Sequence, residues 1–117
     1  MVNHISNREL QELFEFIKSK KNVGAKDSYT SFLLQNPEKL VEKINEESFE
    51  VIIEVLKKNK KKLVKESADL IYHLLVAWIY NEIDTQEVWK ELEKRKIQSG
   101  FQAVSYTHLT LPTTEAV

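Results

Sequence analysis

The scarcity of glycine and proline is the feature that most restricts the fold of this chain. Only two residues of each type occur among the 117 residues of the sequence. Sandwiches and barrels need both residue types at their many turns, whereas long helices form best without them. The composition therefore predicts an all-α fold, and the length suits one compact domain.

The charge balance and the lack of cysteine exclude several function classes. The sequence has 17 Lys and Arg residues, 18 Asp and Glu residues, a formal net charge of −1 and no Cys. Proteins that bind nucleic-acid polymers or anionic membranes usually carry a basic excess, so we expect neither partner. The absence of Cys removes disulfides and thiolate ligands and favours a reducing compartment. The most apolar stretch, residues 68–80, is too short for a membrane span of ~20 residues, and no signal peptide is visible, so we expect a cytoplasmic protein.

Capping residues and apolar periodicity predict two helices in the first third of the chain. Ser6 and Glu9 form a capping-box pattern, and apolar residues follow at helical spacing until about Lys20. After a polar link, Asp27 or Ser28 is a suitable cap for a short helix.

Three longer helices are predicted in the rest of the domain. Asn36 followed by Pro37 indicates the start of one that ends near residue 56. A basic connector over residues 57–62, with five lysines, leads to another helix over about 63–80. Asp84 and Glu87 open the last one, which should end near residue 96.

The C-terminal residues have a different composition from the rest. No Asp, Glu, Lys or Arg occurs between Ile97 and Thr114, and residues 104–114 resemble the translation of an adaptor used to prepare sequencing libraries. We therefore expect the functional domain over residues 6–96 and a non-native or disordered tail over 97–117. His108 lies in this tail and is not a functional candidate.

The helix predicted over residues 37–56 combines a wide apolar arc with a sector of acids. At ~100° per residue, the arc contains Leu40, Val41, Ile44, Phe49, Val51, Ile52, Ile53, Val55 and Leu56. The pattern predicts that this helix is buried on most sides. The remaining sector contains Glu46, Glu47, Glu50 and Glu54 beside Lys43. Acids three or four residues apart repel one another, so stability alone does not explain their concentration.

The helix predicted over residues 63–80 also presents acids from an apolar surface. Glu66, Asp69 and His73 fall on one face, in a segment that is otherwise mostly apolar or aromatic. Acids on two such helices suggest one shared site, and oxygen ligands without Cys favour Mg²⁺ or Mn²⁺ over zinc. Spacing alone leaves a second interpretation open, in which the acids are a solvated face paired with lysines and His73 is a core residue.

The acidic pattern resembles that of a known superfamily. Glu46-Glu47-x-x-Glu50, followed by Glu66-x-x-Asp69, is similar to the paired acidic motif of the all-α nucleoside triphosphate pyrophosphohydrolases, the MazG-like superfamily. Further strings narrow the resemblance to the phosphoribosyl-ATP pyrophosphatases of histidine biosynthesis, over about residues 10–96. These strings are Ser19-Lys20-Lys21, Ser28-Tyr29-Thr30, Lys43-Ile44-Asn45-Glu46-Glu47 and Asp69-Leu70-Ile71-Tyr72-His73-Leu74-Leu75-Val76, although glycine is commoner in the family at the place of Asn45.

The resemblance implies a fold and a set of site residues. The fold would be a bundle of four to five helices, completed by homodimerisation. Its metal-binding positions correspond to Glu47, Glu50, Glu66 and Asp69, which with Glu46 would form the catalytic set around Mg²⁺, or Mn²⁺ in its place. The candidates for substrate binding are Lys20, Lys21, Lys39 and Lys43 for phosphates, and Tyr72 and His73, which would contact substrate or brace the carboxylates.

The resemblance also implies a reaction. This is the magnesium-dependent hydrolysis of 1-(5-phosphoribosyl)-ATP to 1-(5-phosphoribosyl)-AMP and pyrophosphate. Two other functions fit the residues as well. One is a general MazG-like pyrophosphohydrolase for non-standard nucleoside triphosphates, and the other is a non-catalytic helical dimerisation module whose acids only face solvent. The predicted dimer has a physical basis too, because the helix over residues 63–80 has more apolar surface than one short chain can cover.

Overall fold

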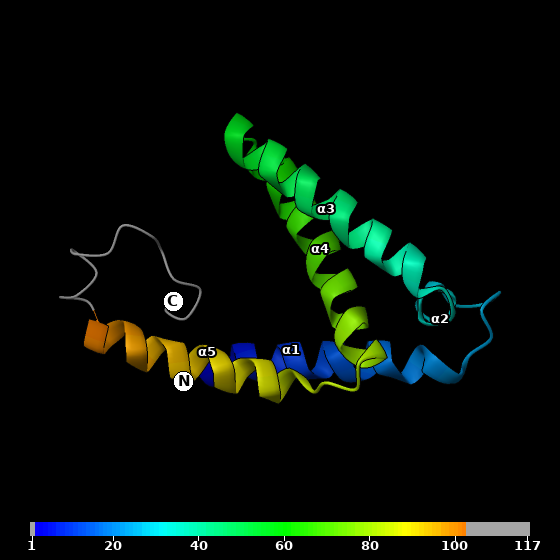
Figure 1. Cartoon of the computed structure of the whole chain (residues 1–117), viewed down its shortest axis with the longest axis horizontal. Coiled ribbons are helices and arrows are strands. Elements are labelled where there is room, and N and C mark those ends of the chain that lie inside the picture. The colour runs from blue at the N-terminus through cyan, green and yellow to red at the C-terminus, as the bar shows by residue number, and fades with distance from the viewer. Residues whose placement is uncertain (1, 103–117) are drawn as a thin grey trace. The chain divides into compact units, whose positions relative to one another are not determined.

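The described part of the chain is entirely helical in its regular structure. The computed structural model describes the backbone of residues 2–102 and the side chains of residues 8–97, in two compact units that are divided between Ile83 and Asp84. The first unit contains α1 (Val2–Lys18), a 3₁₀ turn η1 (Ser19–Asn22), α2 (Tyr29–Gln35), α3 (Pro37–Lys57) and α4 (Lys60–Tyr80), and the second contains α5 (Thr85–Gln102) (Figure 1). The predicted all-α fold is confirmed. The adaptor-like residues 104–114 lie outside the described residues.

Two caps set the start of the short helix and of the helix after it. Ser28 caps α2, because its hydroxyl accepts a hydrogen bond from the backbone N–H of Ser31 at 3.1 Å. Helix α3 begins at Pro37, as predicted. Asn36 occupies the N-cap position, as predicted, but its side chain makes no capping hydrogen bond. Its side-chain amide instead donates to the Phe32 carbonyl of the preceding helix, at 2.8 Å.

Helices α3 and α4 form an antiparallel hairpin with a very short link. Lys58 adopts a left-handed conformation with φ of 57°, and Asn59 caps α4 by accepting a hydrogen bond from the Lys62 N–H at 3.1 Å. The predicted basic connector over residues 57–62 is therefore wrong. Lysine is a good helix former, and an asparagine cap lets the three lysines after it form the first turn of α4. Such a short link makes the two helices antiparallel neighbours, as Figure 1 shows.

The hydrophobic core lies at one end of this hairpin. It joins the first turn of α3 and the last two turns of α4 to α1 and α2, through Phe14, Ile17, Leu33, Leu40, Leu75, Val76 and Ile79. The middle of the hairpin, where the acids are, lies beyond this cluster. The core therefore fixes the position of α4 against α3 without filling the space between the acidic residues.

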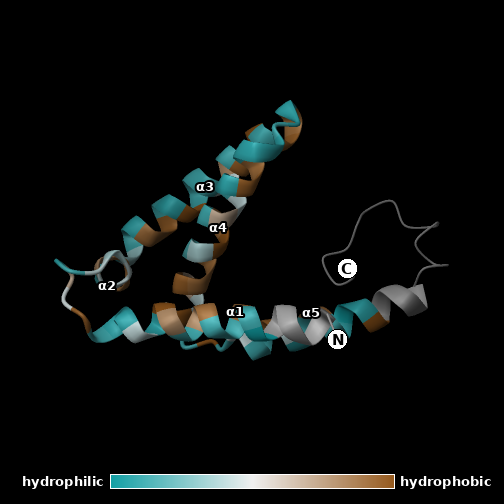
Figure 2. Cartoon of the chain, turned by 180° about the vertical axis from the view of Figure 1, so that it is seen from behind, coloured by the Kyte–Doolittle hydropathy of each residue, from teal (hydrophilic) through white to brown (hydrophobic). Residues whose placement is uncertain are grey.

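The apolar arc of α3 is mostly exposed, which corrects the expectation that this helix is buried on most sides. The buried residues of α3 are Leu40 and two acids, Glu47 and Glu54. Five apolar residues of the arc are each more than half exposed, namely Val41, Phe49, Ile52, Val55 and Leu56. Glu47 and Glu54 occupy the side of α3 that faces α4, so these apolar residues are left on the outer side. Hydrophobic positions recur along both helices of the hairpin in Figure 2.

The first and last helices are longer than predicted. Helix α1 begins at Val2 rather than Ser6 and ends at Lys18, since no glycine or proline interrupts the residues before Ser6. Within the second unit, the Asp84–Glu87 capping box is confirmed, with the Asp84 N–H 3.0 Å from Glu87 Oε2 and the Gln86 N–H 3.3 Å from Asp84 Oδ1. Helix α5 then continues to Gln102. None of the described helices combines the length and the apolar character needed to cross a membrane.

Candidate metal centre

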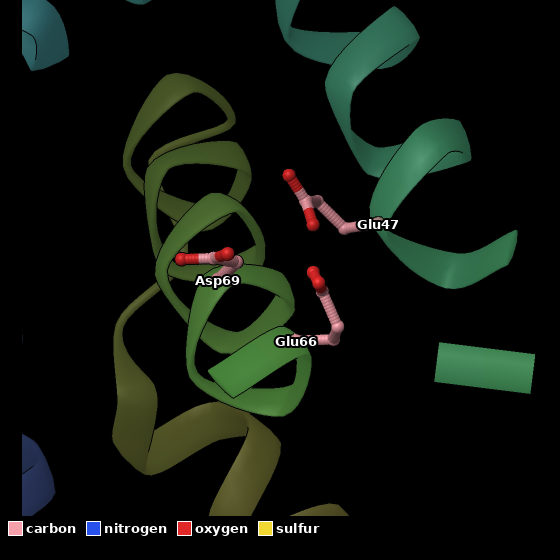
Figure 3. Close-up of side chains that lie close together, drawn as sticks. All are labelled: Glu47, Glu66 and Asp69. Atoms are coloured by element: carbon pink, nitrogen blue, oxygen red, sulfur yellow. The ribbon is translucent and has the colours of Figure 1, made fainter. Parts of the chain in front are cut away.

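Three carboxylates from two helices meet at the middle of the α3–α4 hairpin. Glu47 comes from α3, and Glu66 and Asp69 come from α4. One oxygen of each lies within 4.8 Å of an oxygen of the others, and the three side chains point toward one another (Figure 3). Glu66 and Asp69 are three residues apart and share one face of α4, and the antiparallel register places Glu47 opposite them.

The surroundings of Glu47 fit a hard cation. This residue is only 6% exposed, and its Oε1 atom has no hydrogen-bond partner among the described residues. Its other carboxylate oxygen lies 3.8 Å from the ammonium of Lys43, which is a loose contact. A buried carboxylate with so little compensation is costly, and three converging carboxylates are the ligand type that Mg²⁺ and Mn²⁺ prefer. A divalent cation bound here would offset both the cost of burying the Glu47 carboxylate and the repulsion among the three carboxylates.

The other two predicted acids border this group without joining it. Glu50 shares a hydrogen bond with Glu66, which raises the pKa of Glu50, and burial and the charge of Glu66 raise that pKa further. The raised pKa of Glu50 follows from the density of carboxylates around it. Glu46 lies on the outer side, about half exposed, with its carboxylate 3.3 Å from the Lys43 ammonium.

Among the predicted lysines, Lys43 is the one that the structure brings to the acids. The hydrogen bond with Glu46 is the main reason that the pKa of Lys43 is raised, and Glu46, Tyr29 and Glu47 add smaller electrostatic contributions against the opposing effect of burial. Lys39 lies one turn earlier and pairs with Glu42 at 3.0 Å on the exposed side of α3.

The two lysines of η1 have other surroundings. Lys20 places its ammonium 4.9 Å from the ring centroid of Phe16, and Lys21 is exposed. Within the described part of the chain, neither forms an ion pair with the acids of the hairpin. The structure therefore brings neither of them into the group of three carboxylates.

Tyr72 and His73 connect α4 to α2. The Tyr72 hydroxyl lies 2.6 Å from Thr30 Oγ1, and the Tyr29 hydroxyl lies 3.1 Å from His73 Nε2. Burial raises the pKa of Tyr72, against the opposing effect of the hydrogen bond with Thr30. Sequence reasoning missed Tyr29 and Thr30 as neighbours of the site. The available signal was the string Ser28-Tyr29-Thr30, which was noted only for its resemblance to the family.

The burial of His73 agrees with a core residue, and its contacts agree with a bracing role. Its side chain is 5% exposed, and Nδ1 lies 2.7 Å from the backbone oxygen of Asp69. For Glu47, the low exposure argues against the interpretation of the acids as a fully solvated face. The sequence alone left both interpretations of the acids and of His73 open, because the spacing of residues along a helix does not show which side chains are buried.

The fold and the site together define an all-α protein whose carboxylates meet between two antiparallel helices. The sequence model of the family described as phosphoribosyl-ATP pyrophosphohydrolase matches residues 10–96. The chain is 39% identical over 94 residues to the phosphoribosyl-ATP pyrophosphatase of Paracoccus denitrificans, covering 80% of this chain and 87% of the relative. It is 41% identical over 92 residues to that of Roseobacter denitrificans, covering 78% and 88%, and 35% identical over 92 residues to that of Gluconobacter oxydans, covering 78% and 69%.

The chain belongs to the phosphoribosyl-ATP pyrophosphohydrolase family. This confirms the resemblance that the acidic motif and the Tyr-His string indicate, and it confirms the prediction of an enzyme of the hydrolase class. The matched region covers α2, α3 and α4, which carry the described site, together with parts of α1 and α5.

Proposed function

We propose that this chain hydrolyses 1-(5-phosphoribosyl)-ATP to 1-(5-phosphoribosyl)-AMP and pyrophosphate, with Mg²⁺ held between α3 and α4. Family membership supports the substrate and the reaction. The observation that carries the metal is the meeting of Glu47, Glu66 and Asp69 within 4.8 Å of one another, with one oxygen of Glu47 buried and unpartnered. Mn²⁺ has the same preference for oxygen ligands and would be a functional substitute.

Each acid and the nearby lysine have a separate role in this proposal. Glu47, Glu66 and Asp69 supply the ligand oxygens, and Glu50, whose pKa is raised mainly by its hydrogen bond with Glu66, completes the acidic set in its deprotonated form. When bound, the cation would neutralise charge on the triphosphate and on the leaving pyrophosphate. Lys43 contributes a positive charge to the phosphates, and Glu46 holds its ammonium in place from the solvent side at 3.3 Å.

A pyrophosphate-release assay tests this function. The protein should release pyrophosphate from phosphoribosyl-ATP in millimolar magnesium and lose this activity when the metal is chelated. A panel of nucleoside triphosphates without the phosphoribosyl group serves as the comparison. Equal turnover of the panel would favour the general pyrophosphohydrolase instead, and no turnover of any substrate would favour the non-catalytic dimerisation module.

We propose in addition that the enzyme is a homodimer that associates through the α3–α4 hairpin. The outer side of α3 exposes Val41, Phe49, Ile52, Val55 and Leu56, and an open apolar groove runs along α4 between Lys60 and Ile71, lined by Leu63, Val64, Ser67 and Ala68. Soluble chains rarely leave so many apolar side chains of neighbouring helices in water. A second copy presents the same surface, so a two-fold contact would cover both hairpins at once.

Light scattering at micromolar concentration tests the dimer. Ile52→Asp places a charge in the proposed contact and should yield a folded monomer, because the Ile52 side chain is 54% exposed within one chain. Leu13→Asp is the matched control, since Leu13 is an exposed apolar residue on α1, outside the hairpin. A monomeric parent protein, or a dimer that survives Ile52→Asp unchanged, would contradict this arrangement.

A further inference from the structure

A chain of hydrogen bonds joins α2 to the turn of α4 that carries Asp69. The Tyr29 hydroxyl lies 3.1 Å from His73 Nε2, and His73 Nδ1 lies 2.7 Å from the backbone oxygen of Asp69. A carbonyl oxygen only accepts hydrogen bonds, so Nδ1 must carry a proton. In the neutral imidazole Nε2 is then an acceptor, and the Tyr29 hydroxyl is the donor.

The aromatic rings around His73 fix its orientation. The His73 ring meets Tyr72 edge-on, with centroids 4.9 Å apart and planes at 82°, and it meets Tyr29 in the same way at 5.8 Å and 85°. Helical side chains lean toward the preceding turn, so this ring lies over the peptide of Asp69. The ring is therefore tied to the backbone of the α4 turn that carries Asp69.

We propose that Tyr29 is a positioning residue for the metal-binding carboxylates, which acts by holding His73 against Asp69 through its hydroxyl group. This inference rests on the proposed metal site. The hydroxyl fixes the imidazole, the imidazole fixes the Asp69 turn, and the carboxylates then keep a spacing that suits one cation. Removing a group that does not touch the metal but orients one of its ligands typically lowers metal affinity or activity by about 10–100-fold.

Tyr29→Phe and Thr30→Val form a matched pair of variants. Each keeps the size of the side chain and removes one hydroxyl that bonds α2 to α4, since Thr30 Oγ1 lies 2.6 Å from the Tyr72 hydroxyl. Both should lower the melting temperature to a similar extent, because each removes one partly buried hydrogen bond. Only Tyr29→Phe disturbs the connection to Asp69.

The decisive measurement is Mn²⁺ affinity of the metal-free protein by isothermal titration calorimetry, which does not depend on activity. Tyr29→Phe should weaken Mn²⁺ binding about tenfold, whereas Thr30→Val should stay close to the parent. The nitrogen chemical shifts of His73 should also change in Tyr29→Phe and stay constant in Thr30→Val.

The outcomes separate this inference from the proposed function. If Tyr29→Phe binds Mn²⁺ as tightly as the parent, or if both variants weaken binding equally, the positioning role is wrong while the metal site stands. If the parent itself binds no Mn²⁺, the metal site and the positioning role are both wrong. If the parent binds Mn²⁺ and the two variants differ as expected, but phosphoribosyl-ATP is not hydrolysed, only the proposed reaction is wrong.

Discussion

The Lys43 ammonium lies 3.8 Å from a carboxylate oxygen of Glu47, one helical turn further along α3. Among the described ion pairs, this is the one that reaches the group of three carboxylates. Lys43 is therefore the positive charge that the protein itself supplies to the site. A divalent cation bound by the same carboxylates would take over part of that role.

Replacing Lys43 should reduce the stability of the protein most when the metal is absent. Lys43→Met should lower the free energy of unfolding of the metal-free protein by up to about 1 kcal/mol, because Glu47 loses its partner. Millimolar magnesium should remove most of this difference. Urea unfolding with and without magnesium measures both values. Lys39→Met is the control, because its pair with Glu42 is exposed, and a loss in Lys43→Met that magnesium leaves unchanged would contradict the arrangement.

Binding of metal to the folded protein should raise its melting temperature. A ligand that binds only the folded state stabilises it by about 2.7 kcal/mol at a hundredfold excess over the dissociation constant. Calorimetry of the metal-free protein with added Mg²⁺ or Mn²⁺ checks this. Asp69→Asn should abolish the rise, and the metal-free variant should be as stable as the parent or more so, since one repelling charge is gone.

The Asp69→Asn variant should also lose catalytic activity. Removing one ligand of a catalytic metal forfeits several kcal/mol of charge stabilisation, so kcat/KM should fall by roughly a hundredfold or more. Glu12→Gln is the control, because this acid is exposed on α1. Retained activity in Asp69→Asn, or a parent melting curve that magnesium does not move, would show that the metal is held elsewhere or not at all.

Much of the fold could be predicted because its signals are local. Pro37 at the first helical position and the Asp84–Glu87 capping box each act within one turn, and both predicted starts are confirmed. The link between α3 and α4 could not be predicted from its five lysines, because lysine suits both a solvated loop and a helix. The cap that decides between them, Asn59, is one residue whose side chain accepts a single hydrogen bond.

The exposure of the apolar arc of α3 is the feature that the sequence does not determine. The shared acidic site predicts that the acids of α3 face the other helix, but the width of the apolar arc predicts burial of the remaining sides as well, and a helical wheel does not test that. The structure turns Glu47 and Glu54 inward and leaves Phe49 and Ile52 outside. The contact between Tyr29 and His73 could not be predicted from the sequence either. It joins residues 44 positions apart, and only tertiary packing brings them together.

Glu54 is an acid that the proposed site does not use, and its replacement should stabilise the protein. Its side chain is 8% exposed, and its Oε1 atom has no hydrogen-bond partner among the described residues. Glu54→Leu should raise the free energy of unfolding by about 1–3 kcal/mol, because a buried polar atom without a partner is replaced by an apolar group. For a domain of this size, that is a rise in melting temperature of roughly 4–8 °C per kcal/mol.

Two further measurements make this test specific. Glu38→Leu, at an exposed position in the first turn of α3, should change stability by less than about 0.5 kcal/mol. Pyrophosphate release by Glu54→Leu should match the parent, since Glu54 has no role in the proposed mechanism. A lower melting temperature in Glu54→Leu would mean that this carboxylate has a stabilising partner in solution.

The hydrogen bond between Glu50 and Glu66 should give the metal-free and metal-bound enzymes opposite responses to mild acid. The pKa of Glu50 is raised above its ordinary value of 4.5, so the folded protein holds this proton more tightly than the unfolded chain does. Protonation then favours folding, and this contribution is lost as the pH rises from about 4.5 through the raised pKa. In magnesium the sign reverses, because protons compete with the metal for the same carboxylates and weaken its stabilising effect as the pH falls.

Melting temperatures between neutral pH and about pH 5 test this reversal. We compare the parent with Glu50→Gln, which keeps the size of the side chain and removes the titrating group. The metal-free parent should gain stability relative to Glu50→Gln as the pH falls, because only the parent takes up a proton at this position. The rise that magnesium causes in the parent should shrink over the same range. If the difference between parent and variant is constant with pH in the absence of metal, the pKa of Glu50 is not raised in the folded protein.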